Sequence, residues 1–222
     1  MVLEYGDAGD RSAHARVDLP RVHRPQVSDI GASPPLRLSV IGAGSFATHE
    51  FLPLLKGMDV KLRGIVSQTG VRAQVLAAEY GFAYCASDAD AALDDRETDA
   101  VLVLTRHDTH ARLAARALAA GKHVFVEKPL ALDLDELESV QAAQAASRKL
   151  VMVGFNRRYA PLAMRMKEGF AGRTQPMSIS YFANVGVRPP EHWLHHPREG
   201  GGVILGEAIP LRPLHAGGHH DK

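Results

Sequence analysis

The sequence predicts an α/β protein with a doubly wound parallel sheet, followed by an incomplete α+β second domain. Short apolar segments and helical segments alternate about six times across residues 36–153. A glycine-rich turn follows the first apolar segment, and the alternation stops after Gly154. Alternation of this kind is typical of a parallel sheet that is covered by helices on both faces.

The predicted elements follow one another with short connections. The apolar segment 99–104 is continuous, which is typical of a strand buried on both faces of a parallel sheet. Gly121 is a good C-terminal stop for the alanine-rich helix before it. The expected strands are residues 36–41, 60–66, 82–85, 99–104, 123–126 and 150–153, and the expected helices are residues 45–56, 71–80, 89–93, 111–120 and 134–147.

Three segments of different character divide the chain. Residues 1–35 hold four prolines and scattered charges, so we expect a disordered lead-in or linker there. Residues 36–153 form the sheet domain. Within residues 154–222 we expect a helix at 159–168 and an antiparallel strand at 177–185, and the remainder is rich in Pro, Gly and His. This part is too short for a domain of the usual size, so a truncated second domain is predicted.

The composition excludes several classes of protein. A net charge of +1, with 23% charged and 45% hydrophobic residues, argues against a nucleic-acid or membrane-surface partner. No apolar run approaches the roughly 18 residues of a membrane span. The single cysteine, Cys85, cannot form an internal disulfide and cannot belong to a Cys-rich zinc module. We therefore expect a cytoplasmic protein.

The glycine turn after the first strand has the pattern G-x-G-x-x-A. Gly42 permits the tight turn, Gly44 lets the backbone approach a pyrophosphate, and the small Ala47 lets helix and strand pack closely. The free amides at the helix start, around Ser45 and Phe46, would face the phosphate charge. Small residues also occur in plain structural turns. In this strand–helix context the pattern favours a dinucleotide site in a Rossmann domain.

The end of the second strand usually carries an acidic residue that binds the ribose 2′-hydroxyl of NAD. This sequence has Ser67, Gln68 and Thr69 there, and no carboxylate. Ser67 can hydrogen-bond either a hydroxyl or a phosphate, and Arg72 is close enough in sequence to favour NADP. The cofactor is therefore NAD or NADP, with a slight preference for NADP.

A polar segment with two histidines follows strand 99–104 at its carboxyl end, where ligands bind in open α/β sheets. In the functional interpretation Thr105 and His107 line the nicotinamide-ribose side, and His110 begins the next helix. In the structural alternative Asp108 or Thr109 merely caps that helix, for about 1 kcal/mol. Both interpretations can hold together.

The loop Glu127-Lys128-Pro129 follows the fifth strand, again at the ligand edge. A lysine in this place can be desolvated and can move a proton or polarise a substrate oxygen. The structural alternative is a solvated loop lysine.

Four segments in this order and at this spacing resemble the glucose–fructose oxidoreductase / inositol dehydrogenase (Gfo/Idh/MocA) family. The resemblance covers about residues 36–209, and it is carried by residues 42–44, 105–110, 120–130 and 153–158. The family has an N-terminal Rossmann domain and a C-terminal α/β domain with a large open sheet. That second domain supplies substrate contacts and often an oligomer interface, so the resemblance implies a sugar-like small-molecule substrate and allows a homo-oligomer.

The resemblance also implies a reaction and a set of site residues. Lys128 would be the catalytic lysine in reversible hydride transfer at a sugar, cyclitol or nucleotide-sugar carbinol. A non-catalytic dinucleotide-binding module is the alternative. The expected cofactor-binding residues are Gly42, Gly44, Ser45, Phe46, Ala47, Ser67, Thr105, His107, His110, Glu127, Lys128 and Pro129. Residues 153–159 and His192-Trp193 look most like the branch in which this module follows a zinc-type alcohol dehydrogenase-like domain.

The sequence departs from the family pattern near its end. In the family a second proton-handling histidine ends a Gly-Gly-rich segment of the form Asp-x-x-x-His, and residues 200–209 match only the start of that segment. Gly206 stands at the aspartate position and Pro210 at the histidine position. A frameshifted or truncated reading frame would produce this loss of pattern, and a natural variant is the alternative. Sequencing the source locus past codon 209 tests the hypothesis. We therefore expect nucleotide binding and impaired turnover.

Two further clusters carry residue types that bind ligands in other proteins. His192, His195 and His196 lack a supporting set of carboxylates or cysteines, so we interpret them as loop histidines and expect no metal site. Arg157 and Arg158 are open to two interpretations, a substrate-anion contact or a solvated turn.

Overall fold

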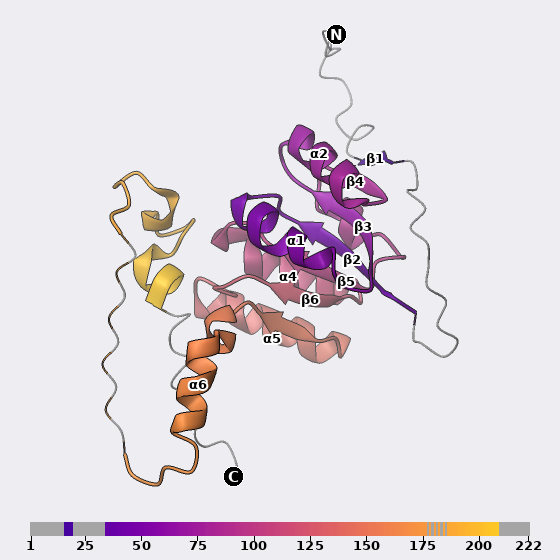
Figure 1. The fold of residues 1–222 in the computed structure, drawn as a ribbon. Helices are drawn as coiled ribbons and strands as arrows, with labels where there is room; N and C mark the ends of the chain where they lie inside the picture. The colour runs from indigo at the N-terminus through magenta and orange to yellow at the C-terminus, as the bar shows by residue number, and fades with distance from the viewer. Residues whose placement is uncertain are drawn as a thin grey trace.

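The computed structural model describes residues 16–19, 34–176 and 186–208, together with residues 178, 180, 182 and 184. Its strands form one seven-stranded sheet in the order β1-β4-β3-β2-β5-β6-β7 (Figure 1). All neighbouring strands are parallel except the edge pair β1 and β4. The strands are β1 Arg16–Asp18, β2 Leu36–Ile41, β3 Val60–Val66, β4 Tyr84–Ala86, β5 Ala100–Val103, β6 His123–Val126 and β7 Val151–Val153. The predicted doubly wound α/β fold is confirmed.

The first strand of the alternation, β2, lies in the middle of the sheet and pairs with both β3 and β5. The chain builds the sheet outward from β2 in one direction and then, from β5 onward, in the other. Loops that leave β2 and β5 therefore diverge, and such a switch point is where open α/β sheets bind ligands. The glycine turn and the Thr105 segment meet at this point.

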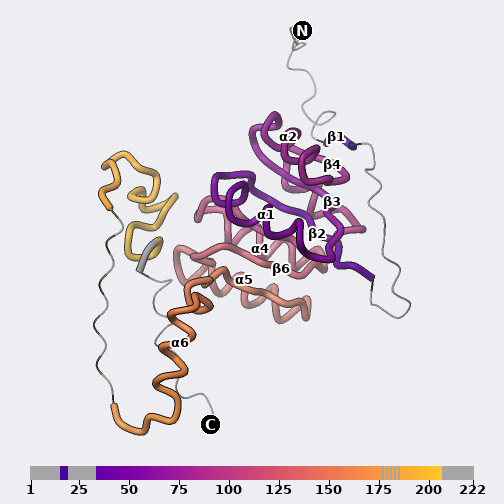
Figure 2. Tube along the Cα trace, in the orientation of Figure 1, coloured from indigo at the N-terminus to yellow at the C-terminus, as the bar shows by residue number. Residues whose placement is uncertain are grey.

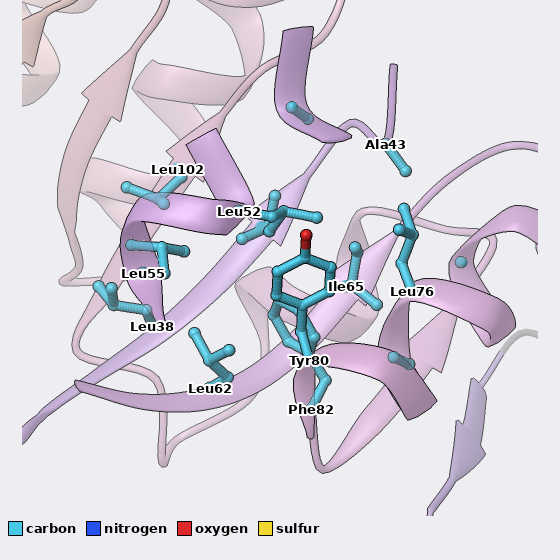
Figure 3. Packing of buried hydrophobic residues seen from close by; sticks show 14 of the residues in the cluster. Leu38, Ala43, Leu52, Leu55, Leu62, Ile65, Leu76, Tyr80, Phe82 and Leu102 are labelled. Carbon is cyan, nitrogen blue, oxygen red and sulfur yellow. The ribbon is translucent and has the colours of Figure 1, made fainter. Parts of the chain in front are cut away.

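Helices cover both faces of the sheet, as Figure 1 shows. On one face Leu52, Leu55 and Leu76 pack against strand residues such as Leu38 and Ile65 (Figure 3). On the other face apolar residues of α3, α4 and α5 pack against the opposite sides of β5 and β6. The helices are α1 Leu52–Leu55, α2 Gly70–Tyr80, α3 Asp90–Leu93, α4 His110–Ala119 and α5 Leu134–Ser147.

The helix after the glycine turn differs in detail from the expected regular helix. Its middle, η1 (Ala47–Phe51), is a π-helix, in which the Leu52 N–H donates to the Ala47 carbonyl oxygen. Pro53 follows at once in α1 and has no N–H to continue the α-helical ladder. A proline in this position is a physical reason for the wider turn before it.

Strand β1 falls within the segment predicted as a disordered lead-in. It pairs with β4 in the register Arg16↔Ala86, and the Arg16 guanidinium lies 3.9 Å from the centroid of the Tyr84 ring. Such a short edge strand has too few residues to show an alternation in sequence. Residues 1–15 and 20–33 lie outside the described residues.

The chain beyond β7 leaves the sheet. It forms η3 Asn156–Tyr159 and α6 Pro161–Gly169, then η4 Trp193–His195 and η5 Ile204–Ala208, drawn from orange to yellow in Figure 2. Helix α6 matches the helix expected at 159–168. Alternate residues of the strand expected at 177–185 lie outside the described set, and described residues such as Phe182 are in no strand. Residues 209–222, with Pro210, also lie outside it. No helix in the described ranges combines the length and apolarity needed to cross a membrane.

Candidate functional site

Gly42 brings the loops after β2 and β5 into contact. Its φ angle is 106°, and its N–H donates to the Val66 carbonyl oxygen at 2.9 Å. A Cβ atom at this position would lie 2.5 Å from the Leu104 carbonyl oxygen. Only glycine combines this backbone conformation with so close an approach.

The next glycine, Gly44, is surrounded by open space, in contrast to Gly42. No atom lies within 4 Å of the place where its Cβ would be, and Gly44, Ser45 and Phe46 are all exposed. The Thr48 N–H donates to the Gly44 carbonyl oxygen at 3.0 Å, which closes the first turn. Backbone amides ahead of that bond have no helical acceptor and form the positive end of the helix. An exposed cradle of this kind fits a pyrophosphate.

Ala47 has the packing role that the pattern predicts for the third small residue. Its side chain is fully buried in the apolar cluster between α1, α2 and the sheet. It therefore holds the helix close to the strand.

The end of β3 carries no acidic side chain, as the sequence shows. Ser67 is half-buried, with its Oγ 3.3 Å from the Thr69 Oγ1. Arg72, in the first turn of α2, lies exposed and donates from Nη1 to the Ala43 carbonyl oxygen at 3.4 Å. A cation is thus held against the glycine turn, where an acidic residue would discriminate for NAD.

The loop after β5 is held by hydrogen bonds among its own residues. The N-cap residue of α4 is Thr109, and its side chain makes no capping hydrogen bond. Its Oγ1 donates instead to the Thr105 Oγ1 at 2.6 Å and approaches the Arg106 carbonyl oxygen at 2.8 Å. The capping alternative is therefore wrong for Thr109. Its hydroxyl joins the end of the loop to Thr105 and Arg106 at the start.

Two histidines of this loop point inward. His107 is 6% exposed, with Nδ1 2.8 Å from the Gly200 carbonyl oxygen and its ring 4.8 Å from the Trp193 ring. His110 is fully buried, with Nδ1 2.7 Å from the Pro129 carbonyl oxygen and Nε2 3.0 Å from the Thr105 carbonyl oxygen. Burial lowers the pKa of both imidazoles, so both rings favour the neutral form.

The carboxyl group of Glu127 is buried at the end of β6. Its Oε2 accepts the Lys128 backbone N–H at 3.0 Å, while Oε1 has no hydrogen-bond partner among the described residues. Burial raises the pKa of this carboxyl. Glu127 therefore faces the protein interior and supports the backbone of the residue that follows it.

Lys128 is half-buried and reaches the segment near the end of the chain. Its Nζ donates to the Gly206 carbonyl oxygen in η5 at 2.6 Å. Pro129 is buried behind it. The loop thus presents one long cationic side chain at the carboxyl edge of the sheet, which argues against a freely solvated lysine.

Residues 192–206 fold back onto this edge, which the sequence alone did not indicate. The Arg106 Nη1 and the Glu199 Oε1 form an ion pair at 2.6 Å, and the Asp108 N–H donates to the Glu199 carbonyl oxygen at 3.2 Å. The Arg106 guanidinium lies 5.5 Å from the centroid of the Trp193 ring. These contacts join residues about 90 positions apart, and the only signal for them in sequence is the family-like segment 200–209.

The remaining candidates lie in two short helical turns, the histidines in and next to η4 and the two arginines in η3. Across the described part of the chain, no three or more His, Cys, Asp or Glu side chains are placed to hold a metal ion. Within that part, His192 uses its Nδ1 to accept the Leu194 N–H at 3.2 Å, as in a turn. Arg157 and Arg158 are exposed in η3.

The doubly wound sheet and the glycine turn at its carboxyl edge define a nucleotide-binding Rossmann protein. Lys128 lies at the same edge. The family model of the Gfo/Idh/MocA oxidoreductases, described as an NAD-binding Rossmann fold, matches residues 36–155. The chain therefore belongs to this family. Whether it comes from the branch fused to an alcohol dehydrogenase-like domain stays a prediction.

Relatives of this chain are named as dehydrogenases and reductases of different compounds. A 4-carboxy-2-hydroxymuconate-6-semialdehyde dehydrogenase of Sphingobium is 35% identical over 127 residues, which are 57% of this chain and 40% of that protein. A 1,5-anhydro-D-fructose reductase of Ensifer adhaerens is 33% identical over 178 residues, 76% of this chain and 52% of that protein. Others are inositol dehydrogenases.

A solved structure shares the fold as well. The 3-ketoreductase of Actinomadura kijaniata, in complex with NADP and TDP-benzene, is 27% identical with a TM-score of 0.64. The match covers 79% of this chain and 55% of that one. This chain spans about half the length of the relatives that it matches.

Proposed function

We propose that this chain binds NADP in preference to NAD and forms the cofactor half of an oxidoreductase. Its substrate would be a carbinol of a sugar, cyclitol or nucleotide sugar. One observation carries the proposal: the open glycine turn after β2 and the Lys128 loop after β6 lie at the same edge of the sheet. The substrate class is supported by relatives named for anhydrofructose and inositols, and by the 3-ketoreductase solved with TDP-benzene.

The described residues fit a dinucleotide along this edge. Gly44, Ser45 and Phe46 would hold the pyrophosphate through their backbone amides. Ser67 and Arg72 would meet the adenosine ribose, and the guanidinium of Arg72 would pair with a 2′-phosphate. Lys128 would lie beside the nicotinamide, as the family resemblance implies.

Other residues that are predicted to contact the cofactor are more buried than the glycine turn. Thr105 is half-buried and would line the nicotinamide-ribose side, with His107 behind it. Ala47, His110, Glu127 and Pro129 are buried, so they would shape the site and would not reach far into it.

When bound, the nicotinamide accepts or delivers the hydride. The protein handles the proton. In the oxidation, the Lys128 Nζ would take the proton of the substrate hydroxyl as the carbinol becomes a carbonyl. In the reduction, the ammonium returns that proton to the carbonyl oxygen. A positioned acid–base group of this kind contributes about 10²–10⁴-fold to the rate.

A non-catalytic dinucleotide-binding module is the second candidate. The Lys128 Nζ donates a hydrogen bond to the Gly206 carbonyl oxygen at 2.6 Å. This contact within the chain favours a structural role for the lysine. Pro210, where the family resemblance implies a histidine, also favours this candidate.

Cofactor fluorescence and absorbance separate the two candidates. The whole chain is titrated with NADPH and NADH and then assayed with a panel of polyols, cyclitols and nucleotide sugars. The variant Lys128→Met is expected to keep nucleotide affinity within about twofold and to lose about 10²-fold or more in turnover. Lys61→Met, exposed at the start of β3, is the matched control.

Each outcome has a separate meaning. Nucleotide binding with turnover that depends on Lys128 supports the oxidoreductase. Binding without turnover of any substrate supports the module. Failure to bind either nucleotide at millimolar concentration contradicts both.

A further inference from the structure

One fully buried side chain faces two loops of the site at once. His110 is the first residue of α4, and its two ring nitrogens face carbonyl oxygens in different loops. Nδ1 lies 2.7 Å from the Pro129 carbonyl oxygen, and Nε2 lies 3.0 Å from the Thr105 carbonyl oxygen. Thr105 follows β5 and Pro129 follows β6, so the ring bridges adjacent strands beyond their ends.

The His110 ring links the loops after β5 and β6 just beyond the point where the pairing of these strands ends. Strands β5 and β6 pair as far as Val103 and Val126, and the Glu127 N–H still donates to the Val103 carbonyl oxygen at 2.9 Å. Beyond that bond, no backbone hydrogen bond joins the two loops among the described residues. The imidazole fills this gap with a rigid ring whose two polar atoms lie on opposite sides.

The surroundings of the ring hold it in one orientation. Its side chain has no exposed surface, and the His107 ring lies 5.7 Å away, centroid to centroid. An imidazole buried without partners would cost several kcal/mol, so a buried ring is tied to the groups it meets. Here those groups are the backbone on both sides of the proposed reaction site.

We propose that His110 is a positioning residue that fixes the Lys128 loop relative to the Thr105 loop. It sets the distance between the cofactor-lining backbone at Thr105 and the backbone next to Lys128, and it touches neither substrate nor cofactor. The effect on ligand binding rests on the proposed function. The bridge between the loops does not, because it is a contact of the chain with itself.

A neutral imidazole has one N–H, so the ring donates a hydrogen bond to one of these carbonyl oxygens and only contacts the other. Two substitutions separate the two contacts. The side-chain amide nitrogen of asparagine reaches about as far as Nδ1, so His110→Asn keeps a donor for the Pro129 carbonyl oxygen and loses the contact to Thr105. His110→Leu keeps a similar volume and loses the hydrogen bond as well as the second contact. Leu113→Ala, buried on the same helix, weakens packing without removing a loop contact and is the matched control.

Hydrogen exchange of the whole chain, read by mass spectrometry on peptides that cover residues 104–109 and 127–132, tests the bridge directly. We expect His110→Leu to speed exchange in both peptides by about tenfold or more, as loss of 1–3 kcal/mol of local hydrogen bonding would. His110→Asn should speed exchange mainly in 104–109. Leu113→Ala should speed exchange within α4 and favour neither loop peptide.

NADPH titration of the same variants tests the consequence for the site. His110→Leu should weaken NADPH binding by about tenfold, and His110→Asn should restore part of that loss. If His110→Leu and Leu113→Ala give the same exchange pattern, the positioning role is overturned. If His110→Leu does not fold, the contrast between His110→Asn and Leu113→Ala decides. If the wild-type chain binds no nucleotide, the proposed function fails, while the exchange data still decide the bridge.

Discussion

The carboxyl group of Glu127 lies against the backbone of Gly154, and the two residues depend on each other. A Cβ atom on Gly154 would come within 2.5 Å of the Glu127 Oε1 and within 3.2 Å of the Phe125 ring. They follow adjacent parallel strands, β6 and β7, and the Gly154 N–H donates to the Val126 carbonyl oxygen at 2.8 Å. The absence of a side chain at Gly154 is what allows the carboxyl to lie inside, where it supports Lys128.

We expect Gly154→Ala to destabilise the chain. The added methyl group must push aside the buried carboxyl or the Phe125 ring, and overpacking of this kind costs about 1–3 kcal/mol. Chemical denaturation measures the change in the free energy of unfolding. Gly169→Ala is the control, because no atom lies within 4 Å of its Cβ position in α6. Equal stability of Gly154→Ala and wild type would contradict the contact.

Glu127→Gln should change the pH dependence of stability. Burial raises the pKa of this carboxyl in the folded chain, so the folded state holds the proton more tightly than the unfolded state. The wild type therefore loses stability as pH rises above the ordinary glutamate pKa of about 4.3, by about 1.4 kcal/mol per pH unit until the raised folded-state pKa is passed. The glutamine variant lacks that loss.

The measurement compares the free energies of unfolding of the two proteins between about pH 4 and pH 7. The advantage of Glu127→Gln should grow with pH, whereas Glu138→Gln, exposed on α5, should run parallel to wild type. A constant difference across this range would show that Glu127 is not buried in its protonated form.

The two glycines of the turn should respond differently to alanine. Gly42→Ala meets the Leu104 backbone and a φ of 106°, so we expect loss of stability together with loss of nucleotide binding. Gly44→Ala meets no atom within 4 Å, so stability should stay within about 0.5 kcal/mol of wild type. Its methyl group would enter the space of the pyrophosphate and should weaken NADPH binding about tenfold or more. Unchanged binding by a folded Gly44→Ala would place the nucleotide elsewhere.

Arg72 should decide between the two nucleotides. We expect Arg72→Gln to weaken NADPH binding by about tenfold or more, because a charge-assisted hydrogen bond contributes about 1.5–3 kcal/mol, and to leave NADH binding nearly unchanged. Fluorescence titration with both nucleotides measures the ratio. Arg112→Gln, exposed on α4, is the control. An equal effect on both nucleotides would assign Arg72 to the pyrophosphate or to no contact.

Self-association is expected from the apolar surface beyond β7. Leu162 and Met166 of α6 and Phe170 at its C-terminal cap recur every four residues and are 79%, 51% and 49% exposed. Light scattering across a range of concentrations should show associated species, and Leu162→Lys should reduce them. A clean monomer of the wild type at high concentration would contradict this prediction.

The sequence by itself determined the sheet domain. The continuous apolar segment at Ala100–Val103, the glycine turn and the stop at Gly121 depend on local chemistry, so the alternation of elements and the ligand edge followed from them. The expected strand 123–126 and helix 134–147 match β6 and α5 residue for residue. The π-helical turn before Pro53 and the edge strand β1 escaped prediction, because one depends on a single missing donor and the other is only three residues long.

Only the tertiary structure decided where the candidate site residues lie and what they contact. By sequence, His110, Glu127 and Lys128 are all expected to contact the cofactor, and the family resemblance makes Lys128 the expected catalytic residue as well. Folding buries the first two and leaves Lys128 half-buried, with its Nζ at the Gly206 carbonyl oxygen 78 positions away. Which side chain faces inward is set by packing between loops that meet only after the sheet has formed, and no local pattern records such long-range contacts.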